Sequence, residues 1–224
     1  DTIKSLFVTL IIHYIYIYEG IFNMNKAIAK FGSLLVMVSV ILFAIFMVTS
    51  KFGSYLVCIF LALGYIMMIV GFHNESDEDR KVSANVGMIF GCMYAVLILL
   101  VYYAQITAVR NDVLNEQAIM VLDFSRGGLL FSYDLLGYGM MSLSTFFIGL
   151  TIKPKDKKDK WLKYLMMIHG VFFFGCFIMP IMGVFSVSMS DGSDSLGGII
   201  ALEFWCAYFL PICILSMIHF KNER

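Results

Sequence analysis

The amino-acid sequence predicts an all-α fold: a polytopic transmembrane helical bundle with six spans. Of its 224 residues, 60% are hydrophobic and only 14% are charged, whereas soluble domains are about 45–50% apolar and about 25% charged. The apolar residues also form long continuous runs, and roughly 20 apolar residues are needed to cross a bilayer as a helix. Continuous rather than alternating apolarity excludes a membrane β-barrel. The formal net charge of zero gives no indication of a nucleic-acid partner.

Six apolar runs are long enough to span a bilayer. Their predicted ranges are 33–50, 54–72, 84–107, 128–152, 162–187 and 196–219. The first two are so close in sequence that we expect a tight antiparallel hairpin. From Met24 the sequence reads as an ordinary start, with two lysines before an apolar run, so residues 24–224 are predicted to form a single transmembrane domain. We interpret residues 1–23 as an extension outside the natural protein, with a seventh, poorly formed helix as the alternative.

The distribution of Lys and Arg among the connecting segments predicts the orientation of the bundle, because cytoplasmic loops are enriched in these residues. If the Met24 end is cytoplasmic, the inner segments carry Lys26, Lys30, Arg80, Lys81, Lys153, Lys155, Lys157, Lys158, Lys160, Lys163, Lys221 and Arg224, and the outer segments carry Lys51, Arg110 and Arg126. The outer run SDGSDS at 190–195 has no positive charge. We therefore predict a multi-pass protein of the cell membrane with both termini in the cytoplasm.

Three ionisable side chains fall well inside the predicted spans: Asp134, His169 and Glu203. Such residues cost a few kcal/mol to insert and are candidates for function by default. With a helical rise of about 1.5 Å per residue, Asp134 and Glu203 lie roughly 9 Å and 10 Å below the outer edges of their helices. His169 is expected far from them, near the cytoplasmic end, as a hydrogen-bonded helix-packing residue.

The matching depth of the two carboxylates predicts a small polar pocket that opens to the outer face among the third, fourth and sixth helices. Its candidate ligand-binding residues are Asp134, Glu203, Gln105, Tyr138, Arg110 and Arg126. Two adjacent carboxylates repel when both are ionised, so a shared proton is expected there. The alternative is interhelical hydrogen bonding that only stabilises the bundle.

The outer segment 111–128 places Leu114, Ala118, Val121 and Leu122 at helical spacing, with polar residues between them. This pattern is typical of an amphipathic helix at a membrane surface. We expect it to be a surface connection that caps the bundle. A lid over the mouth of the predicted pocket is the alternative.

The sequence contains no motif for a catalytic or metal site. Its five cysteines lie inside apolar runs, without CxxC or Cys/His spacing, and neither GxSxG nor a P-loop motif is present. We therefore expect no catalytic residue, no metal and no cofactor, and the sequence leans away from an enzyme.

The stretches YYAQITAVR at 102–110 and LDFSRGGLLFSYDLLGYGMMSLSTFF at 122–147 resemble a family of small polytopic bacterial membrane proteins of unknown function. In that family a Gln–Thr–Val–Arg stretch ends one helix, and an acidic–Leu–Gly–Tyr motif lies in the next. The matching positions are Gln105, Thr107, Arg110, Asp134, Leu136, Gly137 and Tyr138. The resemblance covers the third and fourth predicted helices and implies a protein of the bacterial cytoplasmic membrane, without implying an activity.

Three functions agree with these features. The first is binding of a small solute, an ion or a lipid, in connection with transport, through the outward-facing pocket. The second is a structural or regulatory membrane subunit with a dry, closed bundle and a protein partner. The third is an intramembrane enzyme acting on lipids, with the carboxylates as acid and base. The expected partners are membrane lipids and a small ligand or another protein.

Overall fold

The computed structural model describes residues 2–111, 113–184 and 196–221, with side chains from residue 24 onward, Leu196 excepted. These residues contain helices and turns but no strand, which confirms the all-α prediction. The helices are α1 (Thr2–Thr49), α2 (Lys51–Glu75), α3 (Lys81–Ala104), α4 (Glu116–Leu122), α5 (Leu129–Thr151), α6 (Lys157–His169), α7 (Phe172–Ile181) and α9 (Leu196–Lys221). One π-helical turn, Gln105–Val109, extends α3.

Among the residues that the structure describes, five helical segments are long and apolar enough to cross a membrane. They are Met24–Thr49, Lys51–Glu75, Glu78–Val109, Lys157–Ile181 and Gly197–Lys221, and each overlaps one of the six predicted spans. The fourth predicted span, 128–152, also forms a helix, α5, which contains Asp134 and several Ser and Thr residues and is not among these five segments. The end of the fifth predicted span, 185–187, and the run at 190–195 lie outside the described residues.

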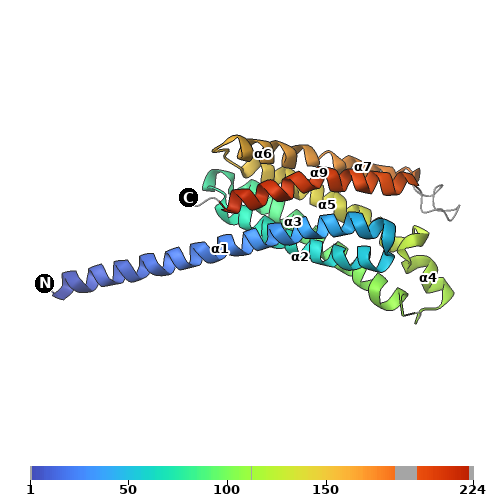
Figure 1. The fold of residues 1–224 in the computed structure, drawn as a ribbon, viewed down its shortest axis with the longest axis horizontal. Coiled ribbons are helices and arrows are strands. Elements are labelled where there is room, and N and C mark those ends of the chain that lie inside the picture. The colour runs from blue at the N-terminus through green and yellow to red at the C-terminus, as the bar shows by residue number, and fades with distance from the viewer. Residues whose placement is uncertain (1, 112, 185–195, 222–224) are drawn as a thin grey trace.

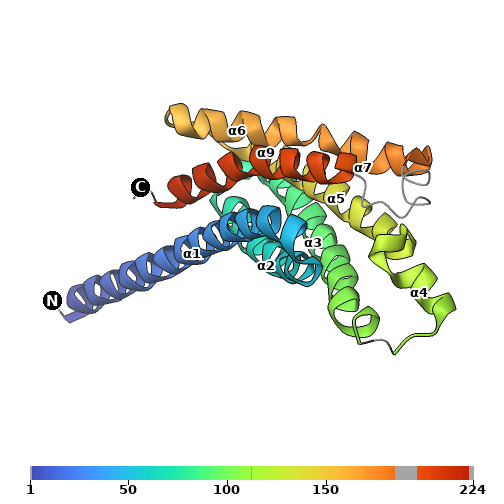
Figure 2. The same ribbon diagram turned by 45° about the vertical axis from the view of Figure 1, so that its right-hand side comes forward.

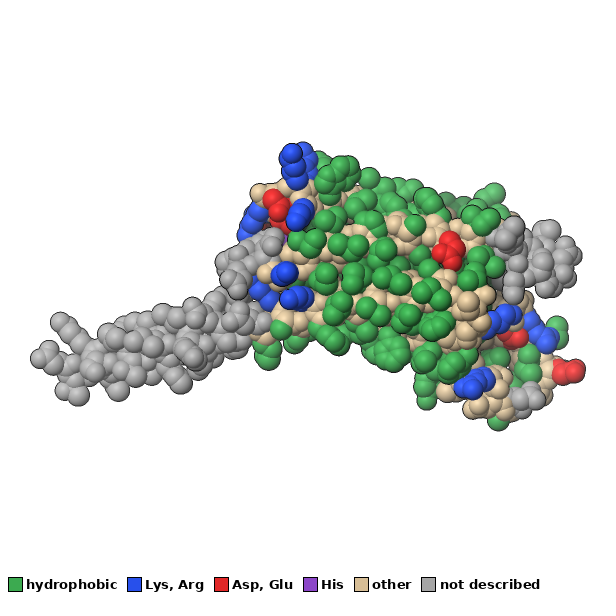
Figure 3. Space-filling model, viewed as in Figure 1, with side chains coloured by type: hydrophobic (Ala, Val, Ile, Leu, Met, Phe, Trp, Pro, Cys, Tyr) green, Lys and Arg blue, Asp and Glu red, His purple; other side chains and the backbone are tan. Residues whose placement is uncertain are grey.

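The long helices run lengthwise through the bundle, and the connections gather at its two ends (Figure 1). One end, called the basic end below, holds the α2–α3 connection, the α5–α6 connection and the last turn of α9. The other end, called the α4 end, holds α4 and the turn between α1 and α2. On the face shown in Figure 3, hydrophobic side chains cover most of the middle, and Lys and Arg gather towards the two ends. This distribution is the one expected of helices that cross an apolar layer.

Helix α5 lies in the interior of the bundle, where it packs against α2, α3, α6 and α7 (Figure 2). Helix α9 packs against α1 and α6. Helix α5, which carries the buried Asp134, is thus the one with the most helical neighbours among the described elements. Polar side chains in an apolar environment need hydrogen-bond partners. In this position the polar groups of α5 lie next to neighbouring helices that can supply them.

Helices α1 and α2 form the tight antiparallel hairpin predicted from the sequence. Ser50 separates them and caps α2, because its hydroxyl accepts a hydrogen bond from the Gly53 backbone N–H. The two backbones come very close at Gly32, where a Cβ would lie 2.8 Å from both the Gly64 carbonyl oxygen and the Met68 nitrogen. The glycine is therefore required by the approach of the two helices.

Residues 2–23 continue α1 as one helix, and this part projects away from the rest of the bundle (Figure 1). The expectation that these residues lie outside the natural protein stays a prediction.

Candidate functional site

Asp134 lies in the interior of the bundle, on the second turn of α5. It is only 5% exposed, and within the described part of the chain its Oδ1 atom has no hydrogen-bond partner. The side chain of Tyr102, from α3, lies near the carboxyl group. A buried carboxylate oxygen without a partner is unfavourable, so Asp134 is an unusual residue to find at the centre of an apolar bundle.

Four buried tyrosines from three helices lie in this interior, and we call them the tyrosine cluster: Tyr65, Tyr94, Tyr102 and Tyr138. The ring centroids of Tyr94 and Tyr138 are 5.7 Å apart, and those of Tyr65 and Tyr94 are 5.0 Å apart. The Tyr138 hydroxyl lies 3.9 Å from the Cys58 sulfur of α2. Like Asp134 Oδ1, the Tyr94 hydroxyl is buried without a hydrogen-bond partner. The interior thus contains unused hydrogen-bonding capacity from both α3 and α5.

Of the six predicted site residues, Asp134 and Tyr138 share this interior. Glu203 lies on α9 and is half-buried. The described contacts include none between Glu203 and Asp134, although the α9 residue Trp205 contacts Tyr138 at a ring-centroid distance of 5.2 Å. The pocket built on both carboxylates stays a prediction.

Gln105 is buried, but its amide group serves the connection that follows α3. Its Nε2 donates to the Leu122 carbonyl at 2.8 Å, and its Oε1 accepts from the Phe124 N–H at 3.1 Å. The first hydrogen bond joins the π-helical turn to the last residue of α4, and the second joins it to the segment that follows α4. Gln105 therefore holds α4 against the end of the bundle and uses both ends of its amide group to do so.

Replacing Gln105 with alanine is expected to loosen the connection between α4 and α5. The change leaves the Leu122 carbonyl and the Phe124 N–H without their partner, which costs about 1–3 kcal/mol. Hydrogen–deuterium exchange should show faster exchange over residues 116–126. The exposed Gln117 on α4 offers a matched control, and equal exchange rates in Gln105→Ala and Gln117→Ala would contradict this role.

The two predicted arginines both lie on the surface of the α4 end. The guanidinium carbon of Arg110 stands 4.2 Å from the centroid of the Phe52 ring, at the start of α2. Arg126 forms an ion pair with Asp123, 3.6 Å from Nε to Oδ2, and its side chain is 54% exposed. Arg110 thus contacts the α1–α2 hairpin, and Arg126 pairs with an acidic residue of its own turn.

The amphipathic segment before α5 forms the predicted helix, although it is only seven residues long, Glu116–Leu122. Asn115 caps it by accepting a hydrogen bond from the Ala118 N–H at 2.9 Å. The turn into α5 passes through Gly127, whose φ of 68° is a conformation that favours glycine. Whether α4 covers a ligand site stays a prediction.

His169 is fully buried, and its hydrogen bonds join three helices. The Trp205 indole N–H, from α9, donates to His169 Nε2 at 3.1 Å, and His169 Nδ1 lies 2.7 Å from the Thr145 hydroxyl of α5. Because an indole N–H can only donate, Nε2 accepts, and the proton of a neutral ring is on Nδ1. This confirms that His169 is a hydrogen-bonded packing residue, placed where α5, α6 and α9 meet.

A second polar cluster, not predicted from the sequence, lies at the basic end. His219 of α9 stands between two carboxylates: its Nδ1 is 2.7 Å from Asp159 Oδ1, and its Nε2 is 3.0 Å from Glu75 Oε2. We call these residues the carboxylate–histidine cluster. Both hydrogen bonds need a proton between nitrogen and oxygen, so the cluster must hold two protons to make them together. It ties α2, α6 and α9 to one another.

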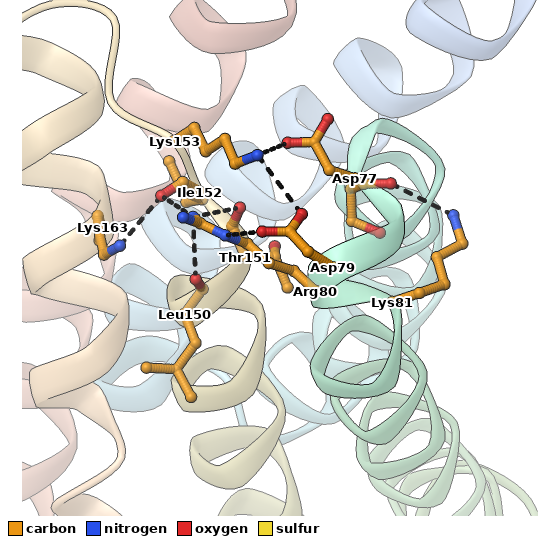
Figure 4. A network of polar contacts seen from close by, with 10 residues as sticks. Asp77, Asp79, Arg80, Lys81, Leu150, Thr151, Ile152, Lys153 and Lys163 are labelled. Atoms are coloured by element: carbon orange, nitrogen blue, oxygen red, sulfur yellow. Dashed lines mark hydrogen bonds and ion pairs between the residues drawn. The ribbon is translucent and has the colours of Figure 1, made fainter.

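The connections of the basic end are joined by a network of charged groups (Figure 4). Arg80 points its guanidinium group at the end of α5, where NH1 donates to the carbonyls of Thr151 and Ile152 at 3.3 and 3.4 Å. Lys153 forms ion pairs with Asp77 at 2.5 Å and with Asp79 at 3.4 Å. The α2–α3 and α5–α6 connections are thus linked by charge and by backbone capping.

The ion pair between Asp77 and Lys153 should make a small, pH-dependent contribution to stability. The hydrogen bond from Lys153 lowers the pKa of Asp77, and the hydrogen bond to Asp77 raises the pKa of Lys153. A lowered acid pKa stabilises the fold above the unfolded value, about pH 4, and the effect is lost as the pH falls further. A raised lysine pKa stabilises the fold below about pH 10.4, and the effect is lost above it.

A double-mutant cycle of Asp77→Asn and Lys153→Gln checks this dependence through thermal unfolding at several pH values. The coupling should be constant between about pH 5 and pH 9 and should vanish in stronger acid or base. Both side chains are about half exposed, so salt should also weaken it. A coupling that persists at a pH below the pKa of Asp77 in both the folded and the unfolded protein would contradict the assignment.

A cavity of about 360 Å³ opens at the basic end, beside the carboxylate–histidine cluster. It lies between the α2–α3 connection, the α5–α6 connection and the last turn of α9. Its lining residues are Phe72, Glu75, Ser76, Asp77, Thr151, Ile152, Lys153, Lys155 and His219. Protein pockets for small molecules are typically about 300–1,000 Å³, so this cavity has the size of a small-molecule site.

Within the described part of the chain, no group of three or more His, Cys, Asp and Glu side chains is placed to hold a metal ion. Comparisons of the chain with models of protein families, with curated proteins and with solved structures found no match. Its function therefore has to be inferred from the placement of its own residues.

Proposed function

We propose that this chain is a six-span membrane protein that binds a proton or another small cation in its interior, at Asp134, in connection with transport. The observation that carries the proposal is the buried Asp134 carboxyl, whose Oδ1 has no hydrogen-bond partner among the described residues. A proton or a bound cation would supply the missing interaction. The tyrosine hydroxyls nearby would serve as further polar groups around such an ion.

Helix α5 is the sixth span in this proposal. Its 23 residues give a helix of about 35 Å, which exceeds the hydrocarbon thickness of about 30 Å. Its modest apolarity is acceptable because neighbouring helices rather than lipid surround it. Ionisable residues in spans mostly face the interior of a bundle in this way and mark binding sites or ion pathways.

The orientation follows from the charges of the basic end. The α5–α6 connection and the first turn of α6 carry five exposed lysines: Lys153, Lys155, Lys157, Lys158 and Lys160. Because short cytoplasmic loops are enriched in Lys and Arg, we place the basic end in the cytoplasm and the α4 end outside. In a bacterium, which the sequence resemblance implies, the chain would lie in the cytoplasmic membrane. Asp134 then lies nearer the outer surface.

Infrared difference spectroscopy of the purified protein between acidic and alkaline pH tests the proposal with the proton as probe. The C=O stretching band of a protonated carboxyl should be lost or shifted in Asp134→Asn. It should remain in the matched variant Glu203→Gln, which removes the other carboxylate of the predicted pocket. A second arm compares thermal unfolding in sodium chloride with that in choline chloride at equal ionic strength.

The stability of Asp134→Asn separates ion binding from a purely structural role. If Asp134 only held helices together, the variant would lose stability. Because Oδ1 has no protein partner, we expect an unfolding temperature equal to that of the wild type or higher. A clear loss of stability, together with infrared spectra and cation responses like those of the wild type, would refute the proposed function.

A further inference from the structure

The cavity at the basic end contains two charged side chains whose hydrogen-bonding capacity the described contacts leave unused. Glu75 uses Oε2 for its contact with His219, and no described contact engages Oε1. No described hydrogen bond or ion pair engages the Lys155 ammonium group, since only the backbone N–H of that residue is bonded, to Asp159, although its charge lies close enough to Asp77 to help lower the pKa of that carboxyl. The other two oppositely charged residues of the lining, Lys153 and Asp77, form an ion pair with each other.

Glu75 lies deeper than Lys155, so the cavity has an acidic inner end and a basic rim. The Glu75 side chain is only 19% exposed and lies against the carboxylate–histidine cluster, whereas Lys155 belongs to the exposed α5–α6 connection. Ser76 and Thr151 also line the cavity. Each hydroxyl donates to the backbone carbonyl three residues earlier in the chain and can still accept a hydrogen bond. The inner part is therefore rich in acceptors, and the rim offers a cation.

We propose that this cavity binds a small zwitterion, with a primary ammonium group against Glu75 and an anionic group against Lys155. A primary ammonium has three donors, which match one Glu75 oxygen and the hydroxyl oxygens beside it. A carboxylate or phosphate at the other end of the ligand meets the lysine of the rim. A singly charged ligand would leave one of the two groups unmatched. This site lies at the opposite end of the bundle from the proposed ion site near Asp134 and does not depend on it.

This chemistry has two sources in a cell. One is a free metabolite that carries an ammonium and an acidic group, and the other is the ethanolamine phosphate head group of a membrane lipid. The cavity lies at an end of the bundle, where lipid head groups would surround a membrane-spanning protein. Both sources present the same pair of charges to Glu75 and Lys155.

Isothermal titration of the purified full chain with O-phosphoethanolamine tests the free form. Glu75→Gln and Lys155→Gln should each weaken binding about tenfold or more. The glutamine at 75 retains an oxygen for His219, and Lys155→Gln leaves the cluster's side chains unchanged, so at least one variant should fold normally. The neighbouring exposed residues Glu78 and Lys157 do not line the cavity, and Glu78→Gln and Lys157→Gln should bind within about twofold of the wild type.

Ethanolamine alone and inorganic phosphate alone separate a zwitterion site from a site for one charge. Both should bind at least about tenfold more weakly than O-phosphoethanolamine. If phosphate binds as tightly and Glu75→Gln has no effect, the cavity is an anion site and the proposal is wrong. If ethanolamine binds as tightly and Lys155→Gln has no effect, it is a cation site, and the proposal is equally wrong.

Native mass spectrometry from nanodiscs of equal parts phosphatidylethanolamine and phosphatidylcholine tests the lipid form. The choline head group has no N–H donor, so retention of phosphatidylethanolamine that Glu75→Gln and Lys155→Gln both reduce would identify the lipid as the ligand. Binding of O-phosphoethanolamine without lipid preference would identify a free metabolite. Binding of neither form would overturn the proposal.

Discussion

Replacing His219 with alanine is expected to lower the free energy of unfolding by about 3–5 kcal/mol, the range seen when one partner of a buried charged group is removed. Without the imidazole, the carboxylates of Glu75 and Asp159 face each other across an emptied space. Their side chains are only 19% and 4% exposed, so solvent compensates little for the loss. Urea or thermal unfolding of the detergent-solubilised protein, followed by circular dichroism, measures the effect.

His73 supplies a matched control at the same end of the bundle. Its ring bonds to the Asn85 side chain at 2.6 Å but is not placed between carboxylates, so His73→Ala should cost only about 1 kcal/mol. The double variant His219→Ala with Asp159→Asn should recover part of the lost stability, because it removes one of the two buried carboxylates that have lost the imidazole as a partner. Equal losses in His219→Ala and His73→Ala would show that the cluster is not a major source of stability.

Replacing Gly32 with valine is expected to destabilise the protein by about 3 kcal/mol or more, at the upper end of what overpacking costs. Even a single Cβ would lie 2.6 Å from the Met67 Cβ and 2.8 Å from backbone atoms of Gly64 and Met68. Backbone atoms cannot move aside as a side chain can, so α1 and α2 would have to separate. Thermal unfolding again provides the measurement.

Gly175 in α7 is the matched control for this substitution. The nearest atom to a Cβ at this position is the Met179 sulfur at 3.9 Å, an ordinary contact distance. Gly175→Ala should therefore be neutral or slightly stabilising, because alanine favours a helix more than glycine does. Gly32→Ala, compared directly with Gly175→Ala, tests the close approach with a single methyl group. Equal stability of these two variants would contradict the close packing of α1 against α2.

The helices of this protein could be predicted from the sequence because continuous apolarity and helix formation reflect the same constraint. A backbone in an apolar layer must satisfy its own hydrogen bonds, so each long apolar run becomes a helix. The helix ends were placed less well: the second span was predicted to begin at residue 54, whereas α2 begins at Lys51, directly after the Ser50 cap. Glycine at position 32 carried no local signal, since the need for it arises only when α2 lies against α1.

The interior site was predicted in part, for a similar reason. A carboxylate within an apolar run is visible in the sequence, and this is why Asp134 was singled out. The roles of Gln105 and Arg110 depend on which groups their side chains meet, and sequence spacing does not show that. The cluster of Glu75, Asp159 and His219 joins residues far apart in the chain. Its only signal was that all three lie near helix ends predicted on the same side of the membrane.

The contact of Trp205 with His169 gives this protein a built-in optical reporter. The chain has only two tryptophans; Trp205 is 6% exposed, whereas Trp161 is 65% exposed on α6. In Trp161→Phe the remaining fluorescence comes from an indole that stacks on Phe209 at 5.1 Å and donates to a histidine. Its emission should shift to longer wavelength only when α9 leaves α5 and α6, so that one spectrum follows the opening of the bundle without an attached dye.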